Sequence, residues 1–144
     1  MALNLLKLCV GVSSVEELQA WRDYKRQENA RKGLPVESKH TTRMVPKRIK
    51  ELLEGGSLYW VIKGNVQIRQ VLTDIRPFTD ANGIRRCDLV LDPQLILTSW
   101  QPRRAFQGWR YLKPEDAPPD LEGNDMSGSL PSELRVELAN LGLL

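Results

Sequence analysis

Apolar and polar positions alternate with two different periods along the chain, so helices and strands can be told apart. Residues 3–12 (LNLLKLCVGV) are almost continuously apolar and end at a Ser pair, which is typical of a strand. From Val15 towards Arg31, apolar residues recur every three or four positions, which predicts a helix. The side chains predicted to face the core from this helix are those of Val15, Leu18, Trp21 and Tyr24.

Both ends of this first helix carry boundary signals. Ser14 and Glu17 have the spacing of a capping box, in which each side chain can bond a backbone N–H of the other residue. Gly33, followed by Pro35, is the usual pattern of a helix end. The boundaries of the helix are therefore predicted from both sides.

A second helix is predicted after the polar connector 34–39 and the four residues HTTR (40–43), so that Lys47 and Arg48 lie on it. Thr42 could be its N-cap, or Val45 if Pro46 occupies the first turn. Its buried side chains are predicted to be Ile49, Leu52 and Leu53. Gly55 and Gly56 are predicted to end it.

The middle of the chain reads as strands. Residues 57–64 (SLYWVIKG) are β-branched and aromatic, and 66–78 form a long strand whose alternation changes phase near Gln70, which predicts a bulge. Asn82 and Gly83 give a strong hairpin signal. The return strand is then 84–92, and the strand after it is 94–100.

The last part of the chain is less regular. Residues 101–121 are rich in Pro, Arg and Gly and are predicted to be an irregular surface segment, anchored by Phe106, Trp109 and Tyr111. Residues 122–129 have the composition of a linker. After Pro131, a terminal helix is expected to present Leu134, Leu138 and Leu141.

These elements predict an α+β fold. Residues 1–121 are expected to form one domain, with a bent antiparallel or mixed sheet, or a small β-barrel, flanked by helices. Residues 122–144 would add the linker and an amphipathic helix that docks on the domain or on a second copy.

Composition narrows the class of protein. The chain has 144 residues, 41% of them apolar and 27% charged, as in ordinary globular domains, and its net charge of +3 permits an anionic partner. Cys9 and Cys87 lie in apolar runs without metal-ligand spacing, so buried thiols in a reducing cytoplasm are expected. The apolar start is too short to cross a membrane. We therefore predict a cytoplasmic protein with no metal, no cofactor and no membrane contact.

The first candidate for chemistry is HTTRMVPKR. A helix that begins there would offer free backbone N–H groups to an anion, surrounded by Thr41, Thr42, Arg43, Lys47 and Arg48. The alternative is that the threonines only cap the helix and that water solvates the cations.

His40 is the single histidine of the chain. It could serve as a general base, but no nucleophile, acid partner or metal-ligand spacing accompanies it. A hydrogen-bonded structural role, or a phosphate contact, is the alternative.

The second candidate is WQPRRAFQGWRYLK, residues 100–113, where cations alternate with rings and no acid intervenes. Such a mixture is used to bind single-stranded nucleic acid. The alternative is that the rings anchor a loop and that the arginines pair with downstream acids. In the first interpretation the nucleic acid contacts Arg103, Arg104, Trp109, Arg110 and Tyr111. In the second the acids that pair with the arginines are Glu115, Asp116 and Asp120.

A third group could arise on the strands, where Tyr59 and Lys63 precede Arg69 and Arg76. Whether it joins the other two groups depends on the fold. Paired catalytic carboxylates and a Gly-rich phosphate loop are not evident in the sequence.

Four blocks of the chain resemble a known family. HTTRMVPKR, GGSLYWVIKG, GIRRCDLVLDP and QPRRAFQGWRYLKPEDAPPDL are similar to the alphaproteobacterial domain-of-unknown-function family 1489, for which no activity is established. Residues 47–78 also resemble PUA-like and ASCH-like domains, small barrels that commonly bind RNA. That second resemblance implies a barrel and an RNA ligand.

The sequence thus predicts a domain that binds RNA or another phosphate-bearing ligand without catalysis. One alternative is an enzyme for a small molecule or nucleotide that uses His40 and Arg43. Another is an interaction module, or a homodimer, that docks through its C-terminal helix. The predicted ligand-binding residues are His40, Thr41, Thr42, Arg43, Lys47, Arg48, Tyr59, Lys63, Arg103, Arg104, Trp109, Arg110 and Tyr111.

Overall fold

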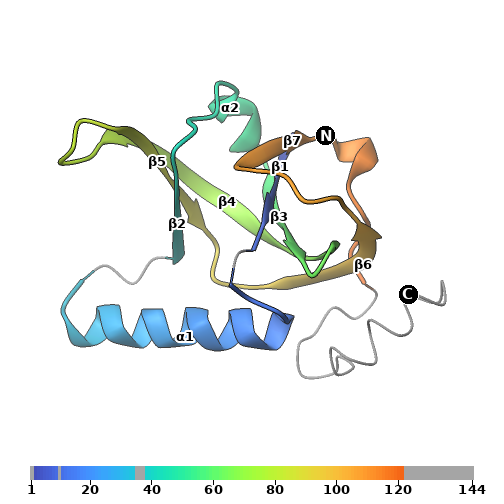
Figure 1. The fold of residues 1–144 in the computed structure, drawn as a ribbon, viewed down its shortest axis with the longest axis horizontal. Helices are drawn as coiled ribbons and strands as arrows, with labels where there is room; N and C mark the ends of the chain where they lie inside the picture. The colour runs from blue at the N-terminus through green and yellow to red at the C-terminus, as the bar shows by residue number, and fades with distance from the viewer. Residues whose placement is uncertain (1, 10, 35–37, 122–144) are drawn as a thin grey trace.

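A computed structural model describes residues 2–9, 11–34 and 38–121. These residues form seven strands and two α-helices, with both helices before β3, and one short 3-10 helix near the end (Figure 1). The predicted linker and C-terminal helix, and the docking or dimer attributed to them, lie outside the described residues. The elements are β1 (Asn4–Leu8), α1 (Val15–Arg31), β2 (Ser38–Thr42), α2 (Ile49–Leu52), β3 (Ser57–Ile62), β4 (Asn65–Thr79), β5 (Arg85–Leu91), β6 (Ile96–Pro102), β7 (Trp109–Leu112) and η1 (Pro114–Asp116).

The strands form one mixed sheet in the order β2-β5-β4-β3-β1-β7, with β6 also paired to β4. Strand β1 runs parallel to β3, whereas the other pairs are antiparallel. The predicted α+β class and mixed sheet are therefore confirmed. The predicted barrel is not confirmed. Strands β2 and β7 stand at the two ends of the order and do not pair with each other among the described residues, so the sheet stays open.

Strand β4 gives the sheet its bend. Over its 15 residues it pairs first with β3 and β6 and then with β5, and the register shifts between Leu72 and Asp74. The bulge predicted near Gln70 therefore exists a few residues further on. The β4–β5 hairpin turns at Gly83, whose φ of 76° suits glycine, so the Asn-Gly signal is confirmed.

Helix α1 begins at Ser14, whose Oγ accepts a hydrogen bond from the backbone nitrogen of Glu17. The Glu17 carboxylate accepts from the backbone and hydroxyl of Ser13 rather than from Ser14, so only half of the predicted capping box forms. At the other end Gly33 has a φ of 71°, as a helix-terminating glycine requires.

The buried stripe of α1 differs from the prediction. It consists of Val15, Leu18 and Arg22, whereas Trp21 and Tyr24 are 52% and 54% exposed. Positions 15, 18 and 22 follow one helical face, whereas the rings at 21 and 24 are turned away from that face by the helical repeat. Helix α1 lies below the sheet (Figure 1), and the two rings are left in solvent because they do not lie on the face that is buried.

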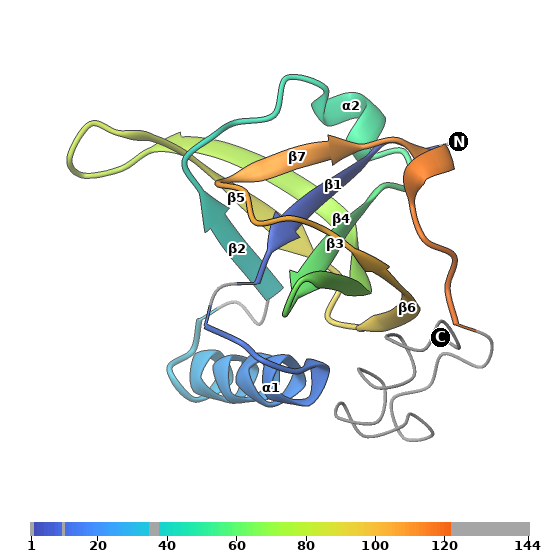
Figure 2. The ribbon, with the colours of Figure 1, turned by 45° about the vertical axis from the view of Figure 1, so that its right-hand side comes forward.

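Two segments have a different structure from the one predicted. Residues 38–42 form β2 rather than a connector and a cap, and α2 is a helix of four residues with no side-chain cap. Residues 109–112, predicted to be irregular, form β7 because they pair with β1. Figure 2 shows β7 beside β1, with α2 above them.

The core has two parts, one on each side of the β3–β1–β7 region. The larger part includes Leu18, Leu52, Trp60 and Trp109, and the smaller one surrounds Tyr59. Cys87 is buried and Cys9 is half-buried, and neither forms a disulfide among the described residues. Within the same residues, no helix combines the length and the apolar character that a membrane span requires.

Candidate nucleic-acid interface

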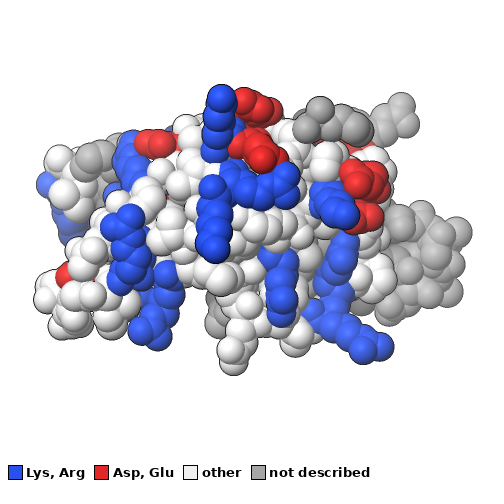
Figure 3. Space-filling view, turned by 90° about the horizontal axis from the view of Figure 1, so that it is seen from above, with Lys and Arg blue, Asp and Glu red and all other residues white. Residues whose placement is uncertain are grey.

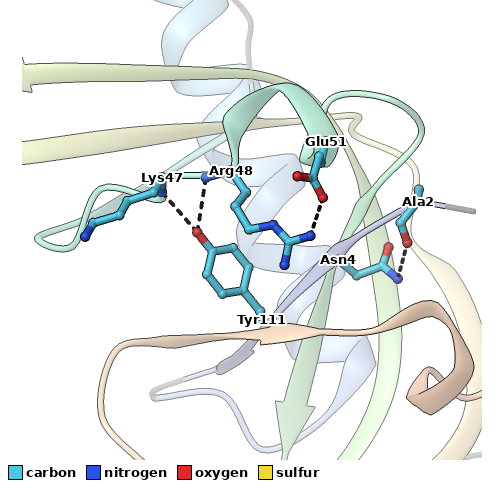
Figure 4. Close-up of polar contacts among 6 residues, drawn as sticks. All are labelled: Ala2, Asn4, Lys47, Arg48, Glu51 and Tyr111. Atoms are coloured by element: carbon cyan, nitrogen blue, oxygen red, sulfur yellow. Dashed lines mark hydrogen bonds and ion pairs between the residues drawn. The ribbon is translucent and has the colours of Figure 1, made fainter.

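Folding joins the loop before α2 to strand β7. The hydroxyl of Tyr111 accepts hydrogen bonds from the backbone nitrogens of Lys47 and Arg48, at 3.0 and 3.2 Å (Figure 4). The indole nitrogen of Trp109 donates to the backbone oxygen of Met44 at 2.6 Å. Residues 43–48 and 109–111 therefore form one surface, which we call the loop–β7 junction.

The local sequence explains why this contact forms. Helix α2 is short, and the Arg48 side chain at its N-cap makes no capping hydrogen bond, so the first N–H groups need another acceptor. The Tyr111 hydroxyl supplies one. Proline at position 46 has no N–H to satisfy, so the donors at 47 and 48 are the ones that Tyr111 meets.

One cation lies against the ring of Tyr111, a residue that is 37% exposed. The Arg48 guanidinium lies 5.7 Å from the ring centroid and also pairs with Glu51, an ion pair that lowers the pKa of the Glu51 carboxyl. Arg43 and Lys47 are exposed and form no ion pair within the described residues. The face on the side of α2 carries many Lys and Arg side chains (Figure 3).

The predicted anion site does not form at a helix N-terminus as expected, because the threonines do not belong to a helix and α2 is very short. Thr41 and Thr42 belong to β2, where the Thr41 hydroxyl donates to Asp88 at 2.6 Å and Thr42 is buried. Neither threonine caps a helix, because the chain from 38 to 42 pairs with β5 before α2 begins. A helix of only four residues also lacks the aligned N–H groups of a full helix end.

His40 faces the interior between β2 and β3. Its ring meets Trp60 edge to face, with centroids 5.1 Å apart, and its Nε2 is buried without a partner among the described residues. Burial, together with the charges of Lys7 and Arg22, lowers the pKa of His40 to about 4. The imidazole is therefore neutral at pH 7. The enzyme alternative with His40 and Arg43 stays a prediction.

Only one of the predicted stacking rings is accessible. Tyr59 and Trp109 are 7% and 5% exposed and belong to the two core clusters, because each points inward from its strand. A base cannot stack on a ring that side chains already cover. Of the three rings proposed from the sequence, Tyr111 alone remains available to a ligand.

The other predicted cations lie apart from Tyr111. Arg110 is on the opposite face of β7, where its guanidinium lies 5.6 Å from the Phe106 ring centroid. Arg103 is bound to Gln101, and its backbone nitrogen donates to Gly64 at 2.8 Å. That contact places it near Lys63, at the far end of β3. Arg104 is exposed in the loop that precedes β7.

The acids predicted to neutralise these arginines do not do so. Asp120 pairs with Arg69 through two hydrogen bonds of 2.8 Å, and Arg76 pairs with Asp74. In the part of the chain that the structure describes, Arg103, Arg104 and Arg110 have no carboxylate partner. The third group of cations, on the strands, is therefore largely neutralised, while the second remains charged.

Sequence reasoning missed two members of the junction. The Met44 carbonyl gave no signal, since any residue has one, but Glu51 could have been found from its spacing of three residues after Arg48 on a helix. The groups that could meet a ligand at the junction are cations, one ring and a hydroxyl. They suit a polyanion with flat bases.

Comparisons with known proteins support one family. The model of the family described as "Protein of unknown function (DUF1489)" matches residues 5–144. No curated protein and no solved structure matches the chain. The similarity to PUA-like domains is therefore a resemblance in the sequence and nothing more. Since the family model covers nearly all of the sequence, the chain belongs to the DUF1489 family.

Proposed function

We propose that this protein binds single-stranded RNA at the loop–β7 junction and does no chemistry on it. The observation that carries the proposal is the double hydrogen bond from the backbone of Lys47 and Arg48 to the Tyr111 hydroxyl. It fixes an accessible ring beside cations that come from a part of the chain more than 60 residues away. RNA offers the phosphates and bases that such a surface can bind.

The phosphate contacts would come from Arg43 and Lys47, which are exposed and unpaired within the described residues. Each would replace a counterion on the RNA backbone, so binding should weaken as salt is added. Arg48 has a different role. Its guanidinium already lies over Tyr111 and is tied to Glu51, so it presents a fixed flat surface.

A base would stack on the combined surface of Tyr111 and Arg48. Bases stack on tyrosine rings and on guanidinium planes in proteins that bind single strands. Double-stranded RNA keeps its bases within the helix, so it would reach only the cations. Preference for a single strand is therefore part of the proposal.

Arg104 and Arg110 would extend the contact around the edge of β7. Among the described residues β7 pairs with β1 alone, which leaves its other edge open there. A strand bound to Tyr111 on one face could continue past the edge to Arg110 on the other. Binding should therefore strengthen with RNA length up to the point where both faces are reached.

Fluorescence anisotropy with a labelled single-stranded RNA of mixed sequence tests the proposal. The double variant Arg43→Ala/Lys47→Ala should bind at least tenfold more weakly at low salt. The slope of log K against log salt should become about 1.4 less negative, at roughly 0.7 for each phosphate that the protein no longer neutralises. Arg85→Ala is the charge control, since Arg85 is exposed at the β4–β5 hairpin.

Two results would overturn the proposal. One is no binding of RNA at low salt by the folded protein. The other is a loss of affinity per removed charge that is the same in the double variant as in Arg85→Ala. Such a result would mean that only the net charge of the protein matters.

A further inference from the structure

Residues of helix α1 and strand β2 line a groove of about 340 Å³. Helices α1 and α2 lie on opposite sides of the sheet (Figures 1 and 2). The groove is separate from the loop–β7 junction, and only Thr41, of the residues predicted to bind a ligand, lines it. The residues that matter to its chemistry are Trp21, Arg22, Lys25, Arg26, Ser38 and Lys39.

Two buried side chains that line this groove each have a polar atom without a hydrogen-bond partner among the described residues. Arg22 is 8% exposed and Ser38 is 5% exposed. One guanidinium nitrogen of Arg22 donates to the Lys39 carbonyl at 3.3 Å. The Nε of Arg22 and the Oγ of Ser38 have no hydrogen-bond partner among the described residues. Both atoms are closed to solvent in this structure, and leaving such a group unsatisfied costs about 1–3 kcal/mol, so a shift of these side chains towards an acceptor in the groove is favourable.

The positive charge of the groove favours an anionic acceptor. Arg22, Lys25, Arg26 and Lys39 line it, none of them in an ion pair within the described residues, and no acid is among the lining residues. The Thr41 hydroxyl at its border donates to Asp88, so that carboxylate already has a partner. A guanidinium N–H and a hydroxyl both donate readily to phosphate oxygens.

One wall of the same groove is aromatic. Trp21 lines it with 52% of the residue exposed, and the Tyr24 ring stacks beside it with centroids 5.9 Å apart. The ammonium of Lys25 lies 5.5 Å from the Trp21 ring. A large ring left in water next to unsatisfied donors suits a ligand that has both a flat group and an anionic one.

We propose that this groove binds a nucleotide, with its phosphate on Arg22 and Ser38 and its base against Trp21. The nucleotide could be free or could be the phosphorylated end of an RNA strand, since both present the same chemistry. The inference does not rest on the loop–β7 junction. It would stand if that surface bound nothing, because no residue is shared between them.

His40 provides a local reporter of the phosphate. Its Nε2 is a third buried and unpartnered polar atom, and both His40 and Arg22 lie against the Trp60 ring, at 5.1 and 5.8 Å. The charged groups near it are Lys7 and Arg22, with the Cys9 thiol. An anion bound at Arg22 would offset these positive charges, so the pKa of His40 should rise.

NMR titration of the full chain tests the proposal. The probes are inorganic phosphate, adenosine, adenosine monophosphate and a short RNA with or without a 5′-phosphate. Adenosine monophosphate should bind at least tenfold more tightly than phosphate or adenosine, shift the Trp21 indole signal and raise the pKa of His40. At the groove residues, tighter binding of the monophosphate than of the 5′-phosphorylated RNA indicates a free nucleotide, and tighter binding of the RNA that needs its 5′-phosphate indicates a strand end.

Variants make the result specific to the groove. Ser38→Ala and Trp21→Ala should each weaken binding of the monophosphate at least fivefold, and Trp21→Ala should not affect folding because Trp21 is exposed. Arg31→Ala, which removes an exposed cation from the same helix, is the control. The proposal is overturned if adenosine monophosphate binds no better than phosphate, or if Ser38→Ala and Trp21→Ala both bind it as the unchanged protein does.

Discussion

The hydroxyl of Tyr111 lies 3.0 Å from the backbone nitrogen of Lys47, a residue 64 positions earlier in the chain. The same oxygen also accepts from Arg48, the N-cap residue of α2, so it bonds the two backbone N–H groups just before the helix. Together with the Trp109 indole, which donates to the Met44 carbonyl, this phenol ties the basic loop to β7. That relationship can be tested without any ligand.

Tyr111→Phe should loosen the loop while it leaves the sheet intact. The variant removes the acceptor of two N–H groups, so we expect a loss of about 1 kcal/mol in the free energy of unfolding. The amides of Lys47 and Arg48 should exchange hydrogen faster, by a factor of ten or more. Hydrogen exchange followed by NMR measures this, and unchanged protection of both amides would contradict the assignment.

Leu18→Ala and Trp21→Ala should have very different effects on stability. Leu18 is 2% exposed within the larger core cluster, whereas Trp21 is 52% exposed. Truncation of the buried leucine is expected to cost about 2–4 kcal/mol, and truncation of the exposed ring less than about 1 kcal/mol. Urea denaturation measures the free energy of unfolding of both variants. Similar losses of stability would mean that Trp21 is packed and that the orientation of α1 is different.

His40 should make the protein less stable as the pH falls from 6.5. Its pKa in the folded chain is about 4 against an ordinary value of 6.5, so the unfolded chain binds the proton more tightly. The contribution is complete above pH 6.5 and is lost progressively towards pH 4. Between pH 6.5 and 5 the loss should be about 1.5 kcal/mol.

His40→Gln should remove this dependence, because no titrating group remains at that position. The neighbouring groups do not titrate in the same window: Lys7 and Arg22 stay charged, and burial raises the pKa of Cys9 to about 11. Free energies of unfolding measured at several pH values in both proteins test the prediction. An equally steep fall in the variant would show that another group is responsible.

Glu51→Gln should strengthen RNA binding. Glu51 pairs with Arg48 at the loop–β7 junction, and its charge repels phosphate. Its removal should raise the affinity about two- to fivefold at low salt, and the gain should shrink at high salt. Asp23→Asn on α1 changes the net charge equally and is the control. The prediction fails if the two variants gain the same affinity.

The first half of the fold was predictable where local signals were strong. The limits of α1 follow from Ser14 and Gly33, and the β4–β5 hairpin follows from Asn82 and Gly83, because caps and tight turns are decided by neighbouring residues. The bulge in β4 was visible as a change of phase. These features need no knowledge of the rest of the molecule.

Other features depend on partners far along the chain. Strand β7 has only four residues, and it is a strand because β1, about a hundred residues earlier, lies beside it. The stretch 38–42 is a strand because β5 pairs with it. Periodicity also placed Trp21 in the core, since the spacing of apolar residues does not show which face of the helix the sheet covers. The α1–β2 groove depends on the position of β2 and on the exposure of Trp21, so it could not be predicted.

The most direct test of the central claim is to map RNA on the protein by NMR. A single-stranded RNA of mixed sequence is titrated into the labelled protein, and the shifts of the backbone amides are followed. The account predicts that the largest shifts occur at residues 43–48 and 109–111 and that they disappear in Arg43→Ala/Lys47→Ala. Shifts that are absent from these residues, or that lie only elsewhere in the chain, would contradict it.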